Sequence, residues 1–179
     1  MSPMPGVLTD AMRQAARSSV LCWLATVDAQ GQPNVSPKEV WAIIDDRHVV
    51  VANIASPVSV RNIAQAPKVC LSFVDVLVEK GFKLTGTARE VLPADPEYLA
   101  WASPLLAITG DRIPVRSVLL ITVQSVFAIV APSYWLFPDT TTESSQIEAA
   151  RRVYGLSSLV NPARSANLNP SRTLPDPRS

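Results

Sequence analysis

Apolar side chains near the start of the chain recur at the spacing of a helix. They are Leu8, Ala11, Met12, Ala15 and Ala16. Side chains three and four positions apart share one face of a helix. Residues 8–17 are therefore predicted to form an amphipathic helix, for which Thr9 or Asp10 can serve as the N-terminal cap.

After Ser19 the pattern changes to runs of β-branched and aromatic residues separated by polar turns, which is typical of strands. These runs occupy residues 20–27, 35–44, 48–52, 68–76, 82–91 and 118–131. The polar segment 28–32 predicts that the first two runs form a hairpin. The unbroken valines of residues 48–52 indicate a strand buried on both faces. The longest run is expected to bend near Gln124 and Ser125.

Three further helices are predicted between and after these strands. Ser56 is a good cap residue and Pro57 fits the first helical position, so a short helix is expected over residues 57–66. The other two helices are expected within residues 95–105 and 140–155, the latter with capping-box spacing at its start and a glycine at its end.

Six strands joined mostly by hairpins, with helices as insertions, favour a small antiparallel barrel over a parallel doubly wound sheet. A chain of 179 residues has the size of a single domain, which we place at residues 1–160. From about Asn161 the sequence is rich in Pro, Ser, Asn and Arg. Residues 161–179 are therefore predicted to form a flexible tail.

The composition limits the classes of partner. Charged residues make up 17% of the chain and apolar residues 47%, against about 25% charged in an average soluble protein. So little polar material favours a surface partly covered by a second copy of the chain. The net charge of +1 provides no overall field for nucleic acid or a membrane surface. The longest apolar stretch, residues 118–131, is shorter than the roughly 18 to 20 residues of a membrane-spanning helix.

Cysteine and histidine are too few for common metal or disulfide frameworks. Cys22 and Cys70 both lie in apolar runs, and His48 is the single histidine. No zinc spacing is present, so no metal site is expected. Two buried thiols and the absence of a secretory signal indicate a reducing, cytoplasmic location.

The junction between residues 48–52 and the helix predicted after them carries the most informative polar groups. A helix start presents unpaired backbone N–H groups and the positive end of the peptide dipoles. Ser56, Ser59 and Arg61 add two hydroxyls and a cation there, a combination that suits a phosphate. The alternative is that Ser56 is only a cap and Arg61 only a solvated side chain.

Three segments in order carry a resemblance to a known family. They are LATVDAQGQPNVSP at residues 24–37, VVVANIASPVSVRNIAQAPKVCLSF at 49–73 and KLTGTAREV at 83–91. Together they resemble the pyridoxamine 5'-phosphate oxidase-like, FMN-binding split-barrel superfamily, over residues 8–92 and more weakly to about 156. The resemblance implies a mainly β fold with peripheral helices, built on a six-stranded antiparallel split barrel.

The resemblance also implies a set of FMN-contacting residues. Those expected against the flavin ring and ribityl chain are Asn53, Ile54, Ala55 and Ser56. Those expected near the phosphate are Ser59, Arg61 and Lys38, and Lys83 is expected to flank the ring. Many members carry a basic residue three positions before the helix asparagine, here Asn62, where this chain has Ser59. The phosphate is therefore expected to depend more on Arg61, Lys38 and the helix N-terminus.

Three further residues have two interpretations each. Glu39 is either an ion-pair partner of Lys38 or a carboxylate of the pocket. Trp41 either packs in the core or stacks on the flavin. Trp23 has apolar neighbours on its strand, which favours core packing.

The resemblance implies a homodimer with FMN at the subunit interface, and an oxidoreductase that transfers hydride or electrons to or from an unidentified small substrate. The cofactor would carry the chemistry in such an enzyme. Three alternatives stay open: a non-catalytic flavin-nucleotide-binding or storage module, a structural dimer with no cofactor, and a deazaflavin or haem, which other members of the superfamily bind. Haem is disfavoured because the single histidine, His48, is expected to be a solvated turn residue.

Overall fold

A computed structural model describes residues 4–5 and 8–156 of the chain, so the tail predicted at 161–179 lies outside the described residues. The strands are β1 (Met4–Pro5), β2 (Cys22–Val27), β3 (Pro33–Lys38), β4 (Trp41–Ile43), β5 (His48–Asn53), β6 (Lys68–Asp75), β7 (Lys80–Val91) and β8 (Ser117–Val130). The α-helices are α1 (Asp10–Arg17), α2 (Pro57–Gln65), α3 (Tyr98–Thr109), α4 (Ser133–Leu136) and α5 (Glu143–Val153). No helix in this described part has the length and apolar character needed to cross a membrane.

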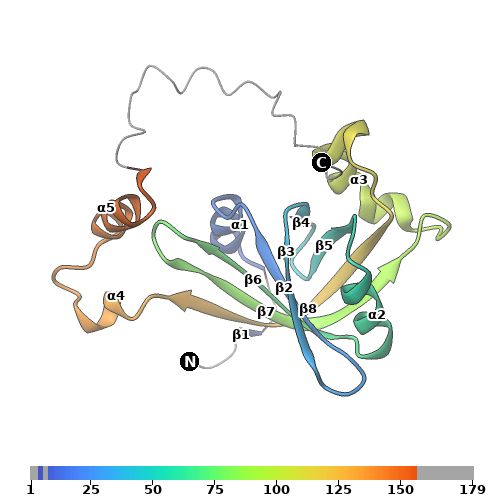
Figure 1. Cartoon of the computed structure of the whole chain (residues 1–179), viewed down its shortest axis with the longest axis horizontal. Coiled ribbons are helices and arrows are strands. Elements are labelled where there is room, and N and C mark those ends of the chain that lie inside the picture. The colour runs from blue at the N-terminus through green and yellow to red at the C-terminus, as the bar shows by residue number, and fades with distance from the viewer. Residues whose placement is uncertain (1–3, 6–7, 157–179) are drawn as a thin grey trace, which may run out of the picture.

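The strands form one curled antiparallel sheet in the order β3-β2-β6-β7-β8-β5-β4, with β1 added beside β8 (Figure 1). The predicted mainly β split-barrel class is thus confirmed. The eight strands of the described residues exceed the predicted six because the run at 35–44 divides into β3 and β4, and β1 was not predicted.

The division of this run joins the two edges of the sheet. β3 pairs with β2, whereas β4 pairs with β5 at the opposite end of the strand order. Between them the backbone carbonyl of Val40 accepts a hydrogen bond from Ala52 N at 2.9 Å. The two residues between Lys38 and Trp41 therefore carry the chain from one edge of the sheet to the other, which curls the sheet into a partly open barrel.

The bend predicted in the last strand is a β-bulge. Thr85 pairs with Ser125 while Gly86 pairs with Val123, so Gln124 is the extra residue of β8. Gly86 lies so close to the backbone of β8 that a Cβ there would collide with the Thr122 carbonyl. A bulge bends its strand and increases the local twist, which helps the long β7–β8 pair to follow the curl.

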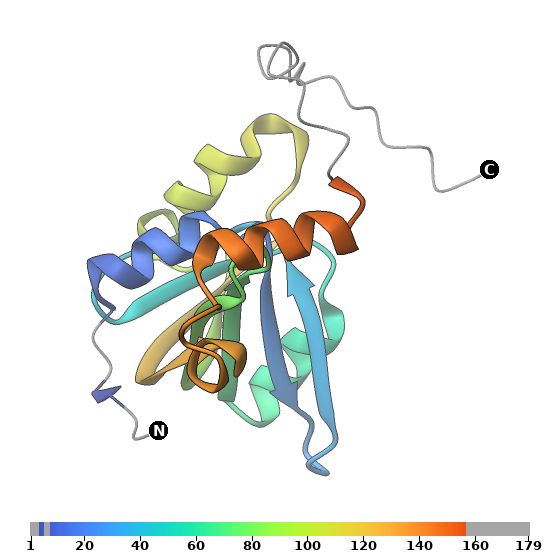
Figure 2. The same cartoon turned by 90° about the vertical axis from the view of Figure 1, so that its left-hand side faces the viewer.

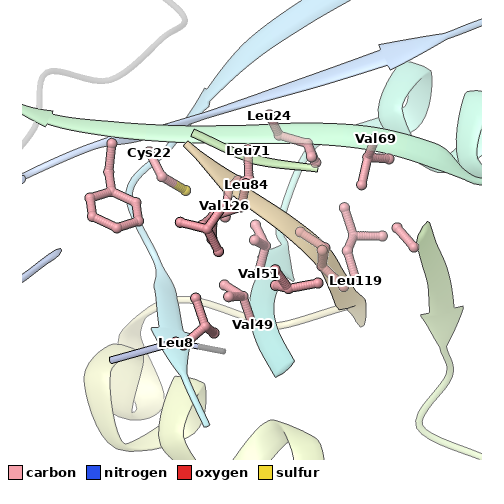
Figure 3. Packing of buried hydrophobic residues seen from close by; sticks show 14 of the residues in the cluster. Leu8, Cys22, Leu24, Val49, Val51, Val69, Leu71, Leu84, Leu119 and Val126 are labelled. Carbon is pink, nitrogen blue, oxygen red and sulfur yellow. The ribbon is translucent and has the colours of Figure 1, made fainter. Parts of the chain in front are cut away.

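The core has two parts, one on each face of β5. Val49 and Val51 belong to the larger cluster inside the curled sheet, which Figure 3 shows converging with Leu24, Leu71 and Leu84 from the neighbouring strands. Val50 and Ala52 belong to a second cluster under α3, with Tyr98, Ala102 and Leu105. Burial of β5 on both faces is therefore confirmed.

The helices gather at two places around the sheet. Figure 2 shows α1, α3 and α5 along one end of it and α2 at the other, beside the β2–β3 hairpin. Thr9 caps α1, as predicted, by accepting a hydrogen bond from Met12 N. The capping box of α5 pairs Thr142 with Ser145. α3 begins later than predicted because Asp95 caps the preceding turn, accepting a hydrogen bond from Leu92 N at 2.7 Å.

Candidate functional site

Ser56 lies at the N-cap position of α2 but does not act as the cap that the sequence predicted. Its side chain makes no capping hydrogen bond. The Asn53 side chain instead holds the backbone of Ser56, because its Oδ1 accepts a hydrogen bond from Ser56 N at 3.2 Å. The Ser56 hydroxyl accepts instead from Lys38 Nζ at 2.5 Å. This arrangement directs Ser56 towards β3 rather than into its own helix.

β3 and α2 face each other through polar side chains, in contrast to the apolar packing elsewhere. Alternate residues of a strand share one face. The side chains of Asn34, Ser36 and Lys38 therefore lie on the face of β3 that is turned towards α2. We call the polar contact between the two elements the α2–β3 seam; its residues are Asn34, Ser36, Lys38, Ser56, Ser59 and Asn62. The Ser36 and Ser59 hydroxyls lie 3.5 Å apart. The amides of Asn34 and Asn62 both donate to Thr26 Oγ1, at 3.2 and 3.1 Å.

Lys38 is the charged member of the seam. It is only 6% exposed, and its Nζ donates to Ser56 Oγ and, at 3.5 Å, to Ser59 Oγ. No ion pair with a carboxylate is found for it among the described residues. Burial lowers the pKa of this amine, an effect that the nearby Cys22 thiol partly opposes. A buried cation without a counter-charge is costly, so an anion bound here would be strongly favoured.

Asn62 offers a second unused group in the seam. It is 1% exposed, and its Oδ1 has no hydrogen-bond partner among the described residues. Buried polar atoms are nearly always paired. The atom is an acceptor, so it suits a donor such as a hydroxyl group of a ligand or a water molecule.

Several predicted site residues are placed around the seam or away from it. Ile54 is half-buried and packs against the cluster under α3. Ala55 and Arg61 are exposed, the first at the turn into α2 and the second in its second turn. Lys83 is exposed on β7, with its Nζ 4.9 Å from the centroid of the Phe127 ring. The structure therefore does not bring Lys83 into the seam.

Glu39 and Trp41 belong to a different cavity from Lys38. Together with Arg13 and Arg17 of α1 they line a cavity of about 460 Å³. Trp41 also packs against Phe73, with ring centroids 5.3 Å apart. Lys38 is not among the residues that line this cavity. The structure thus separates the buried donors around Lys38 from the cavity that Glu39 and Trp41 line.

Trp23 does not pack in the core as the sequence analysis favoured. It is 44% exposed, because Cys22 and Leu24 occupy the inward positions of β2 and leave Trp23 on the outer face. His48 begins β5, where its Nδ1 lies 2.8 Å from Asp45 Oδ2 and its ring 5.2 Å from that of Trp101. Burial tends to raise the pKa of Asp45, but hydrogen bonds from His48 and the backbone lower it overall.

Sequence reasoning missed the partners that hold Asn53. Asn53 Nδ2 donates to Ser117 Oγ at 2.8 Å and to Glu90 Oε1 at 3.4 Å. The Ser117 hydroxyl donates in turn to Glu90 Oε1. Ser117 is 1% exposed, at the start of β8. No local sequence signal marks these two residues, because they meet Asn53 only through the pairing of β5, β8 and β7.

Comparisons with known proteins agree with this fold. The family model described as pyridoxamine 5'-phosphate oxidase matches residues 8–129, which include every predicted site residue. The structure of HupZ from Group A Streptococcus is 28% identical to the chain, with a TM-score of 0.59 over 67% of this chain and 92% of HupZ. No curated protein matches.

Two solved structures of lower identity share the fold alone. An FMN-binding protein of Syntrophomonas wolfei is 15% identical, with a TM-score of 0.57 over 69% of this chain and 87% of that one. HutZ, the heme storage protein of Vibrio cholerae, is 20% identical, with a TM-score of 0.51 over 69% and 95% of the two chains. These two structures therefore support the fold of the chain and nothing finer.

Proposed function

The chain belongs to the pyridoxamine 5'-phosphate oxidase family, and from this premise we propose that it binds FMN with the phosphate held at the α2–β3 seam. The observation that carries the proposal is the Lys38 ammonium group, which is buried beside the start of a helix with serine hydroxyls as its hydrogen-bond partners. A phosphate supplies the counter-charge that this cation lacks.

The residues of the seam fit a phosphate by their donor chemistry. Lys38, Ser56 and Ser59 bring an ammonium group and two hydroxyls together. The first N–H groups of a helix have no partner within it and carry the positive end of the dipole. Arg61 is exposed in the second turn of α2, and we assign it to the phosphate as a solvated cation.

The remaining predicted contacts concern the rest of the cofactor. The unpaired Oδ1 of Asn62 suits a hydroxyl donor, such as the ribityl chain of FMN carries. Asn53, Ile54 and Ala55 precede the phosphate group along the chain and are assigned to the ribityl chain and ring. Glu39 and Trp41 line the open cavity and are assigned to the ring or the substrate, as is the exposed Lys83.

A second copy of the chain is proposed to complete the pocket. None of the seam residues lines any of three well-defined cavities of the described part, although Thr26, which bonds Asn34 and Asn62, lines one of them. The outer face of the β2–β3 hairpin carries exposed Trp23 and Val35. Apolar residues grouped in this way, on a chain with few charges, support a homodimer.

FMN supplies hydride or electron transfer when it is bound, so we propose an oxidoreductase acting on a small molecule. The alternative is a module that stores the flavin nucleotide without using it. Anaerobic addition of NADH or NADPH separates them, because fast and saturable bleaching of the flavin band supports the enzyme. Slow bleaching without saturation supports storage.

The test of the binding proposal is the visible spectrum of the purified protein, with mass identification of what denaturation releases. Added FMN should also raise the melting temperature by mass action. Release of FMN, or stabilisation by FMN beyond that by riboflavin, is the expected result. A Soret band with released haem, or a colourless protein that FMN does not stabilise, would overturn the proposal.

A further inference from the structure

A chain of hydrogen bonds links the proposed phosphate group to a carboxylate on another strand. It runs from Glu90 on β7 through Ser117 on β8 to Asn53 at the end of β5, and from there to the backbone N–H of Ser56. Ser117 and Asn53 are 1% and 8% exposed. These buried bonds are sheltered from competition with water, so their directions are set by the groups at the two ends.

The Glu90 end determines which way each hydrogen points. A carboxylate only accepts hydrogen bonds, so the Ser117 hydroxyl must donate to Glu90. The Ser117 oxygen can then accept from Asn53 Nδ2, which also donates to Glu90 Oε1 at 3.4 Å. With Nδ2 held in this direction, Oδ1 of Asn53 faces the Ser56 N–H. The orientation of the Asn53 amide therefore depends on Glu90.

The Lys38 end imposes the opposite polarity. An ammonium group only donates, so the Ser56 and Ser59 oxygens accept from Lys38 Nζ. Asn53 thus holds the backbone N–H of Ser56, and Lys38 holds its side chain. A hydroxyl oxygen that accepts from Lys38 leaves its own hydrogen to donate to a ligand.

We infer that Glu90 is a positioning residue that acts through Ser117 and Asn53 to hold the start of α2, and with it Ser56, in the geometry in which the α2–β3 seam binds a phosphate. This inference rests on the proposed function of the seam. It goes further in naming the remote residue that holds this end of the seam in place.

The test compares Glu90→Gln with Glu148→Gln in the full-length protein. Both variants remove one negative charge, but Glu148 is exposed on α5 and outside the network. A glutamine amide can donate as well as accept, so Glu90→Gln frees the Asn53 amide to turn. We expect Glu90→Gln to weaken FMN about tenfold while riboflavin affinity stays constant. Glu148→Gln should leave both affinities unchanged.

Amide exchange at Ser56 provides a second readout that needs no ligand. Its N–H should exchange faster in Glu90→Gln than in Glu148→Gln, because its Asn53 acceptor is no longer held. Ser117→Ala interrupts the same chain and should give the same two changes. If FMN and riboflavin bind the wild type equally, the proposed function fails, and faster exchange would still support the network. Unchanged exchange in Glu90→Gln and Ser117→Ala would overturn the inference.

Discussion

Two lysines of the protein, Lys38 and Lys80, show how the same side chain can be held in opposite ways. Lys80 begins β7 with a side chain 37% exposed and its Nζ 2.8 Å from Glu143 Oε1. The same Nζ lies 4.2 Å above the centroid of the Tyr134 ring. The hydrogen bond to Glu143 raises the pKa of Lys80, whereas burial lowers that of Lys38.

The difference separates a satisfied cation from one that lacks a counter-charge. Lys80 is half-exposed and has both a carboxylate and an aromatic ring beside it, so it fastens the start of α5 to the sheet. Lys38 is buried with hydroxyl partners alone. A fold that retains such a lysine bears a cost in stability, and a bound anion offsets that cost.

The largest expected effect comes from replacing the buried cation. Lys38→Met should raise the free energy of unfolding by about 1 to 3 kcal/mol, because an apolar side chain of similar length removes the desolvation cost. Urea denaturation without ligand measures the change. A loss of stability would show that the serine hydroxyls compensate the charge, and that the comparison between the two lysines is wrong.

The difference in free energy of unfolding between Lys38→Met and the wild type should depend on pH, because the pKa of Lys38 is lowered. Between this lowered pKa and the ordinary value of 10.5, the unfolded state binds more protons than the folded state. The stability of the wild type should therefore rise with pH in that window. The advantage of Lys38→Met should shrink as the pH increases from neutral towards 10.5. Urea titrations across this range test it, and an advantage that stays constant would contradict the lowered pKa.

Lys80→Met provides the matched comparison, because the contribution of Lys80 to the free energy of unfolding should change with pH in the opposite direction. The pKa of Lys80 is raised, so the stability from its pair with Glu143 is present at neutral pH and is lost as the pH rises through that raised value.

Arg61→Ala should have a smaller effect, confined to ligand binding. Arg61 is exposed, so its contact with a phosphate is screened by water, and we expect a loss of about 1 kcal/mol in FMN affinity. Riboflavin affinity should not change, because riboflavin lacks the phosphate. Arg112→Ala removes another exposed arginine, at the end of the short 3₁₀ helix Gly110–Arg112, and serves as the control. Equal losses for the two ligands would remove Arg61 from the phosphate site.

The smallest effect is expected for the pair between Lys80 and Glu143. Glu143→Gln should lower the free energy of unfolding by about 0.2 to 1 kcal/mol, as is usual for exposed ion pairs. FMN affinity should be the same as in the wild type. Thermal denaturation and FMN titration measure the two quantities, and any change in FMN affinity would link α5 to the site.

The sequence pattern was sufficient to predict the strands in which apolar residues either alternate with polar ones or form an unbroken run. The valines of β5 predicted burial on both faces, and the polar residues after Val27 predicted the first hairpin. The division of residues 35–44 into β3 and β4 could not be predicted, because the apolar pattern continues across it. What breaks the strand is a hydrogen bond from Ala52 to Val40, a contact between the two edges of the sheet.

The candidate site was predictable only in part. The sequence placed Lys38 and Glu39 in one site, but β3 ends at Lys38 and Glu39 lies in the link to β4. The cavity that Glu39 and Trp41 share excludes Lys38. Glu90 and Ser117 could not be found from the sequence. They lie 37 and 64 residues from Asn53, and only the order of strands in the sheet brings the three together.

The most direct test of the account is calorimetric titration of FMN and of riboflavin into the wild type and Lys38→Met. The account predicts that the wild type binds FMN at least about tenfold more tightly than riboflavin, because only FMN has a phosphate that forms charged hydrogen bonds with the seam. It also predicts that Lys38→Met abolishes this preference and leaves riboflavin affinity intact. Equal affinities in the wild type, or a preference for FMN that survives in Lys38→Met, would contradict it.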